Sequence, residues 1–151
     1  ARYEPSGMYE VPQWSNVIYK YAGGVTVYCG HDYRDGTLFE GERGTIFVDR
    51  KQLVATPSEI LDASPSDGDV HLYQSKDHVA NWLECVRSRQ RPICDVAIGH
   101  RSATVCHLGN IAIRTGRKIT WDPASEKIVG DAEAAKLAKR PYRSPWVLSI
   151  I

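Results

Sequence analysis

The sequence predicts an α+β fold, in which a mostly antiparallel sheet has helices packed on one face and its other face available for association. Strand-like alternation fills the first half of the chain and helix-like spacing fills the second half, an order that is typical of this layered class. The chain has 151 residues, of which 42% are hydrophobic and 25% are charged. This is an ordinary globular composition, and the length suits one domain.

The first expected hairpin lies between residues 16 and 30. Apolar side chains alternate with others over residues 16–22, which predicts a strand. Gly23-Gly24 can adopt positive φ at little cost and predicts a tight turn. Residues 25–30 should then return as the second strand of the hairpin.

A second group of strands is expected after a polar loop. Residues 37–41 and 45–49 are rich in β-branched and aromatic side chains and flank a short turn at 42–44. Residues 52–55 predict another short strand, and residues 70–74 predict a brief one. Because the connections are short, we expect neighbouring strands to pair as an antiparallel meander within one sheet.

Capping residues and apolar spacing predict the first two helices. A short helix is expected over residues 57–61, with Thr56 as its cap and Pro57 at its first position. A longer helix is expected over residues 77–89, where apolar side chains recur at helical spacing until Pro92 prevents continuation.

The longest predicted helix begins after its cap, Asp95, and runs to about Thr115, where Gly116 should end it in a left-handed conformation. Its core-facing stripe is expected to comprise Ile98, Val105, Leu108, Ile111 and Ala112. A strand over residues 118–122 and a short charged helix over residues 132–140 should follow, before an extended tail that ends in RPYRSPW.

Charge and cysteine content exclude several classes of protein. Nineteen basic and eighteen acidic residues give a formal charge of +1, so we expect no nucleic-acid partner. No stretch approaches the roughly 18 apolar residues of a membrane span, and we expect no membrane partner. The four cysteines form no C-x-x-C pair, and we expect Cys85 and Cys106 to be buried, reduced thiols.

One group of candidate substrate-binding residues lies in the loop HDYRDG at residues 31–36. His31, Tyr33 and Arg34, together with Asp32, offer donors and acceptors suited to sugar hydroxyls, and loops held by a sheet often carry function. Turn formation alone would also explain the Asp-Gly pair that ends the loop.

A second group lies on the longest predicted helix. His100, Thr104 and His107 share one stripe, and His100 with its neighbour Arg101 could contact a substrate. The two histidines stand two turns apart, about 10–11 Å along the axis, which is too far for one metal ion. The simpler interpretation is that the histidines bind loop carbonyls and that Arg101 forms a salt link to the sheet or to another domain. We assign no metal ligand.

Three segments resemble the carboxyl-terminal domain of Gfo/Idh/MocA-type oxidoreductases. FEGERGTIFVDR at residues 39–50 is similar to a hairpin of that domain, with Gly41 and Gly44 at the turn glycines. The run RPICDVAIGHRSATVCHLGNIAIRTGRKITWDP at residues 91–123 resembles its long helix, most strongly in a planctomycete-type branch, and the RPYRSPW tail resembles its end.

The resemblance implies an oxidoreductase whose NAD or NADP is bound by an amino-terminal Rossmann domain. It also implies that residues 1–151 are a single carboxyl-terminal domain, which shapes the pocket for a sugar, cyclitol or derivative and supplies the oligomer interface. The expected partners are therefore that Rossmann domain, a small-molecule substrate and further copies of the chain joined through the free sheet face.

The sequence lacks the parts of the family pattern that carry catalysis. The family's catalytic lysine lies in an E-K-P-like motif, which does not occur here, and no G-x-G-x-x-G follows a strand. We therefore assign no catalytic residue and expect these residues alone to bind no cofactor. A non-catalytic binding or scaffold domain with the same fold is the alternative.

Overall fold

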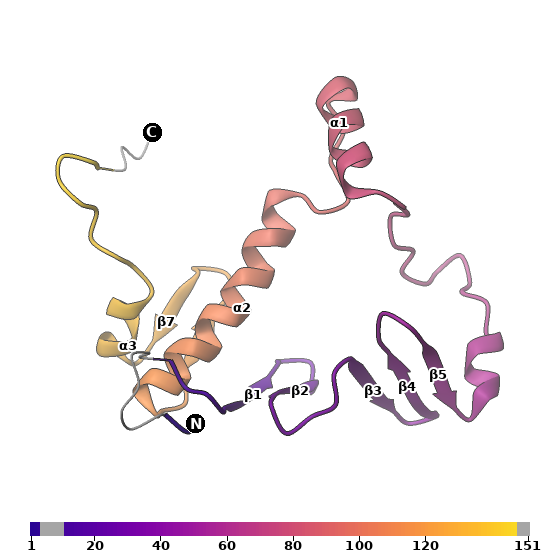
Figure 1. Ribbon diagram of the computed structural model, residues 1–151, viewed down its shortest axis with the longest axis horizontal. Helices are drawn as coiled ribbons and strands as arrows, with labels where there is room; N and C mark the ends of the chain where they lie inside the picture. Colours follow the sequence, from indigo (N-terminus) through magenta and orange to yellow (C-terminus); the bar gives the residue numbers. More distant parts are fainter. Residues whose placement is uncertain (4–10, 148–151) are drawn as a thin grey trace. The chain divides into compact units, whose positions relative to one another are not determined.

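The structure is a computed structural model that describes residues 1–3 and 11–147. It confirms the α+β class, since antiparallel strands and three α-helices make up its regular structure (Figure 1). The chain divides into two compact units. Residues 1–30 and 94–151 form the first unit, and residues 31–93 form the second.

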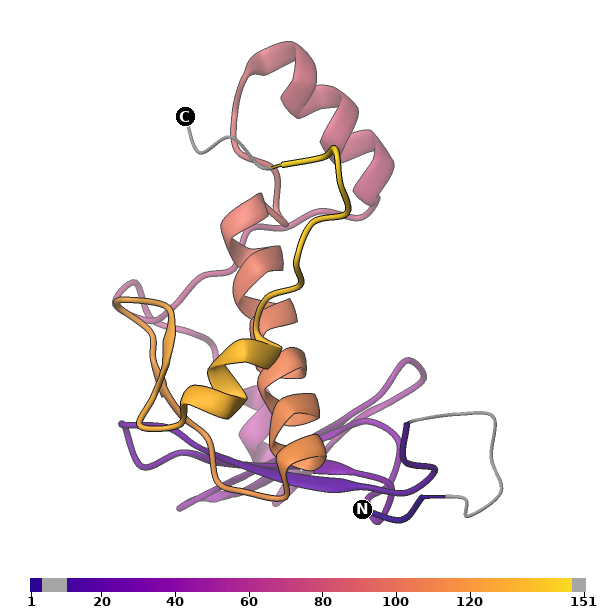
Figure 2. The ribbon, with the colours of Figure 1, turned by 90° about the vertical axis from the view of Figure 1, so that its left-hand side faces the viewer.

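The first unit contains two β-hairpins and two helices (Figure 2). In each hairpin the two strands pair antiparallel, and Tyr19 lies opposite Val27 in the first. Helix α2 contacts both β1 and α3. The elements are β1 (Asn16–Lys20), β2 (Thr26–Gly30), α2 (Val96–Thr115), β6 (Thr120–Asp122), β7 (Lys127–Val129) and α3 (Ala132–Leu137).

The second unit contains a three-stranded antiparallel sheet in the order β3-β4-β5. Its elements are β3 (Thr37–Gly41), β4 (Gly44–Val48), β5 (Leu53–Thr56), the 3₁₀-helix η1 (Ser58–Asp62) and α1 (His78–Ser88). The side chain of Asn81 in α1 accepts a hydrogen bond from the Ile93 N–H at 3.0 Å, which ties the two ends of the α1 segment together.

Aspartate caps begin the two longer helices, and Asp95 is the cap that the sequence predicts for α2. The Asp77 carboxylate accepts from the Ala80 N–H at 2.7 Å, and the Asp95 carboxylate accepts from the Ala97 N–H at 2.8 Å. Gly116 ends α2 with φ 65°, the left-handed conformation that glycine adopts without a Cβ clash. These contacts fix both ends of α2.

Several predicted details of the strands and of the short helix are wrong. The strands form three separate sheets instead of one, because short connections build hairpins but do not oblige one hairpin to pair with the next. Residues 70–74 form no strand, and β7 was missed. Thr56 does not cap the short helix, because the extended Pro57 stands between it and Ser58, and no side chain caps this end.

The core is small. The buried apolar side chains among the described residues are Cys85, Ile111 and Ala134. On the predicted stripe of α2, Ile111 is buried, but Ile98 is 52% exposed because it stands in the first turn of the helix. No helix within residues 1–3 and 11–147 is long and apolar enough to cross a membrane.

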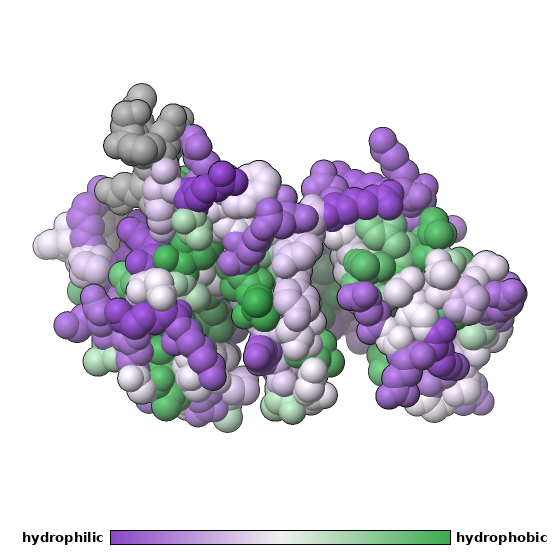
Figure 3. Space-filling view, turned by 90° about the horizontal axis from the view of Figure 1, so that it is seen from below, coloured by the Kyte–Doolittle hydropathy of each residue, from purple (hydrophilic) through white to green (hydrophobic). Residues whose placement is uncertain are grey.

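The chain exposes far more surface than its mass requires. Its accessible surface is 13801 Å², whereas a compact monomer of 16.9 kDa exposes about 7,700 Å² and two equal domains of that total mass about 9,300 Å². Figure 3 shows apolar residues, in green, at the surface of both units. Much of the apolar side-chain area is therefore exposed on the chain itself.

Candidate functional site

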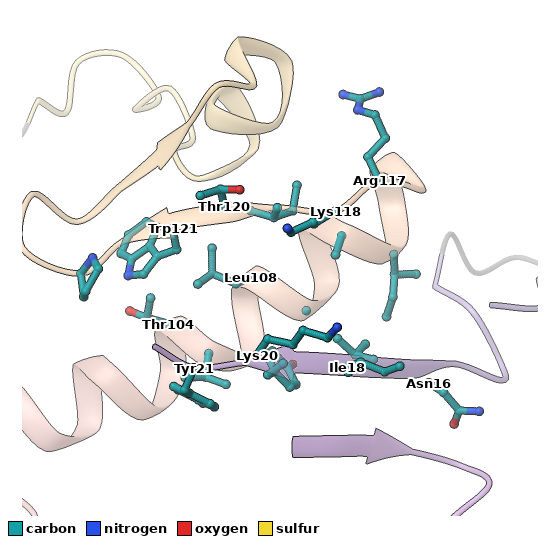
Figure 4. A pocket seen from close by; sticks show the side chains of 18 of the residues that line it. Asn16, Ile18, Lys20, Tyr21, Thr104, Leu108, Arg117, Lys118, Thr120 and Trp121 are labelled. Carbon is teal, nitrogen blue, oxygen red and sulfur yellow. The ribbon is translucent and has the colours of Figure 1, made fainter. Parts of the chain in front are cut away.

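An open pocket of about 970 Å³ lies within the first unit. Strand β1 forms one side, the chain from Gly116 to Trp121 forms the other, and α2 lies between them (Figure 4). Most of the lining is apolar, as is usual for ligand pockets of this size. The apolar residues on α2 are Val105, Leu108, Ala112 and Ile113.

One end of this pocket is polar, and we call it the polar end. It consists of Arg101, Thr104 and Glu126 together with the neighbouring His100. His100 Nε2 lies 3.1 and 3.0 Å from the two carboxylate oxygens of Glu126. A carboxylate only accepts, so Nε2 carries the proton of this bond. The Thr104 hydroxyl donates to the His100 carbonyl at 2.8 Å.

The polar end combines residues from two elements. His100, Arg101 and Thr104 follow the first turn of α2, and Glu126 stands in the turn of the β6–β7 hairpin with φ 51°. The Trp121 indole extends from β6 toward α2 in Figure 4. A guanidinium, a carboxylate and an aromatic face in one pocket can bind the hydroxyls and the apolar face of a sugar ring.

Three cationic side chains also line the pocket away from the polar end. Lys20 on β1 and Lys118 line it from opposite sides, and Arg117 also lines it. The Arg117 guanidinium binds Asp131 at 3.0 Å and Glu133 at 2.8 Å. The hydrogen bonds that the guanidinium donates to Asp131 and Glu133 raise the pKa of Arg117, and the bond to Asp131 lowers the pKa of Asp131.

Tyr19 is held between β1 and α2. A Cβ on Gly109 would collide with the Tyr19 hydroxyl, so the missing side chain of this glycine leaves the space that Tyr19 occupies. Burial is the main cause that raises the pKa of Tyr19, and the nearby thiols of Cys29 and Cys106 raise it further. The phenol therefore serves here as a packed, uncharged group.

The predicted site residues fall in different units. His100 and Arg101 lie at the polar end of the pocket, in the first unit. His31, Tyr33 and Arg34 lie in the second unit, exposed on the loop between β2 and β3. The Arg34 guanidinium stacks on the Phe47 ring at 4.0 Å from its centroid.

Two interpretations made from sequence need correction. His100 binds a carboxylate rather than a loop carbonyl, because Glu126 lies in the turn beside it. Cys106 is exposed rather than buried, while Cys85 is buried as predicted; all four cysteines are free. No group of three or more metal-binding side chains occurs among the described residues.

Sequence reasoning missed Glu126 and Trp121 as members of the site. Trp121 was seen only as part of a strand, and Glu126 carried no motif. The sequence did contain one signal, the segment DPASE at residues 122–126. Its Asp-Pro start is typical of a turn and could have indicated the β6–β7 hairpin.

Comparison with known proteins identifies the family. Residues 5–148 match a family model described as the C-terminal alpha/beta domain of the Gfo/Idh/MocA oxidoreductase family. The chain therefore belongs to this family of oxidoreductase C-terminal domains, in which an amino-terminal domain is the partner. No curated protein and no solved structure matches the chain.

Proposed function

We propose that the chain is the substrate-binding and oligomerisation domain of an NAD(P)-dependent oxidoreductase that acts on a sugar, cyclitol or derivative. The family match over residues 5–148 is the observation that carries this proposal. In this proposal the nicotinamide cofactor is bound by the amino-terminal Rossmann domain of the protein. The amino-acid sequence of residues 91–123 favours the planctomycete-type branch of the family.

The polar end of the pocket is the proposed substrate contact. The Arg101 guanidinium and the Glu126 carboxylate are the groups that bind vicinal hydroxyls, and His100 positions Glu126 through its 3.0 Å contact. His31, Tyr33 and Arg34 are a second proposed contribution, because they are exposed on a loop held between two strands.

Exposed apolar side chains on the strands support the oligomerisation role. Ile18 and Tyr28 are directly opposite each other on β1 and β2, and each is 56% exposed. Leu38, Phe39 and Leu53 in the second unit are exposed to a similar extent. Association with further copies of the chain would bury this area.

The test is steady-state kinetics on the protein encoded by the complete reading frame that contains this chain. NAD(P)H oxidation is followed with a panel of keto-sugars and keto-cyclitols, and the active substrate is used to compare Arg101→Gln with Arg87→Gln. Arg87 is a matched control, because it is exposed on α1 and its ion pair among the described residues is a 4.0 Å contact with Glu84.

We expect Arg101→Gln to raise KM about tenfold or more while Arg87→Gln leaves KM unchanged, since a charge-assisted hydrogen bond to substrate is lost in the first variant only. Equal KM values for both variants would remove Arg101 from the substrate site. A protein that binds a ligand but never oxidises NAD(P)H would support the scaffold alternative instead.

A further inference from the structure

We propose that the pocket of the first unit is a slot for one additional β-strand, which pairs with β1 on one side and with residues 118–121 on the other. The inserted strand comes from the part of the same polypeptide that precedes Ala1. It would join the β1–β2 and β6–β7 hairpins into one continuous sheet over α2, while the polar end stays open for a ligand.

The pocket meets both strands edge-on. A cavity that covered one face of a strand would be lined by every second residue, since side chains alternate between faces. Here every residue from Asn16 to Ala22 lines the pocket, and so does every residue from Gly116 to Trp121. The backbone edges of both segments therefore face the space between them (Figure 4).

The edge of β1 that faces the pocket carries backbone groups with no strand partner in residues 1–3 and 11–147. The Tyr21 N–H donates to the Val25 carbonyl at 2.9 Å, so Tyr21 is a hydrogen-bonded partner of Val25. In an antiparallel pair such positions alternate, and the N–H groups of Ile18 and Lys20 must then point away from β2. β1 has no other strand partner among the described residues.

Residues 118–121, on the opposite side of the pocket, also present a free strand edge among the described residues. β6 pairs only with β7 within the described part of the chain, and residues 118–121 line the pocket with their other edge. Between the two edges lies the apolar face of α2, with Leu108 and Ala112 among its residues. A strand in this position would satisfy two rows of backbone donors and acceptors and cover an apolar surface.

A second copy of the chain is a poor occupant. In a second copy β1 is paired with β2, so that copy would have to insert a whole hairpin. The slot is bounded by a strand on each side and therefore accepts a single strand rather than a hairpin. Ala1 itself lines the pocket, so residues joined to its amino group start at the slot. Because this segment is covalently joined to Ala1, its effective concentration at the slot is high.

Hydrogen exchange resolved at single amides tests the proposal. It is measured on the 151-residue chain and on the protein encoded by the complete reading frame. In the 151-residue chain we expect alternation, with the Tyr19 amide protected and the Ile18 and Lys20 amides exchanging freely. In the longer protein the Ile18 and Lys20 amides should exchange about a hundredfold or more slowly, because both become hydrogen-bonded.

Two substitutions provide a second measurement. Lys20→Pro removes the N–H that points into the slot, and Lys20→Gln is the matched control that keeps this N–H but removes the charge. The two variants should melt at similar temperatures in the 151-residue chain. In the longer protein Lys20→Pro should melt several degrees below Lys20→Gln.

The outcomes are decisive either way. Free exchange of the Ile18 and Lys20 amides in the longer protein would overturn the proposal, and so would a reading frame that starts at Ala1. If the Ile18 and Lys20 amides become more protected from exchange as the concentration of the 151-residue chain rises, a second copy fills the slot. That result would overturn the proposal that the strand comes from the segment before Ala1. If Lys20→Pro fails to fold, amide exchange in the unsubstituted proteins decides alone.

Discussion

Substitution of Gly109 tests how α2 packs on β1. This glycine is buried in α2, and a methyl group there would meet the Tyr19 hydroxyl and then the ring carbon Cζ at 3.2 Å. Gly99 lies in the same helix with no atom near the position that a Cβ would take. The two glycines therefore share a helical backbone and differ in the space beside them.

The expected changes in the free energy of unfolding have opposite signs at Gly99 and Gly109. Alanine in place of glycine stabilises a helix by up to about 1 kcal/mol, so Gly99→Ala should raise the free energy of unfolding by that order. At Gly109 the same gain is offset by overpacking, which costs about 1–3 kcal/mol. Gly109→Ala should therefore lower the free energy of unfolding by about 0–2 kcal/mol.

Urea denaturation followed by circular dichroism measures both variants, and the double variant Gly109→Ala/Tyr19→Phe identifies the colliding atom. Removing the hydroxyl leaves Cζ as the nearest atom, at a distance that a shift of a few tenths of an ångström relieves. We expect most of the lost stability to return. A collision between position 109 and the Tyr19 hydroxyl is ruled out if Gly109→Ala stabilises as much as Gly99→Ala, or if Tyr19→Phe restores no stability.

Two further predictions concern the carboxylates at the helix ends and turns. Asp95→Ala should lower the free energy of unfolding by about 1 kcal/mol in urea titrations, whereas Asp95→Asn, which can still accept from the Ala97 N–H, should change it by less than half as much. The pKa of Asp131 is lowered mainly by the hydrogen bond that Arg117 donates to it, and further by the Ala134 N–H. Its charged form therefore stabilises the fold above about pH 4, the ordinary pKa of a carboxyl group. This stabilisation is lost as the pH falls through the folded-state pKa. Asp131→Asn should therefore reduce stability at neutral pH and flatten its decline below about pH 4; a decline as steep as that of the unsubstituted chain would contradict this assignment.

The helices were predictable because their signals are local. Asp77, Asp95 and Gly116 act on neighbouring N–H and C=O groups, so their roles follow from spacing alone. The hairpins of the first half were predictable for the same reason. The division into three sheets was not, because it depends on which strand edges meet across the fold, and sequence alternation carries no information about that.

The site was predictable only in part. His100 was identified from its position on a helical stripe and Arg101 as its neighbour, and the structure brings both to the polar end. Glu126 lies 26 residues further along the chain and reaches His100 only because the β6–β7 hairpin turns back toward α2. Such a contact has no sequence signal of its own.

Helix α2 connects the two proposed roles of the pocket. Its first half carries His100, Arg101 and Thr104 at the polar end, and its second half carries Ala112 and the apolar residues beside the slot. A strand bound along the second half would fix the separation of β1 from residues 118–121, and through β6 the position of the turn that holds Glu126. Filling the slot should therefore also order the substrate contact, so we expect Lys20→Pro in the longer protein to raise KM although Lys20 lies outside the polar end.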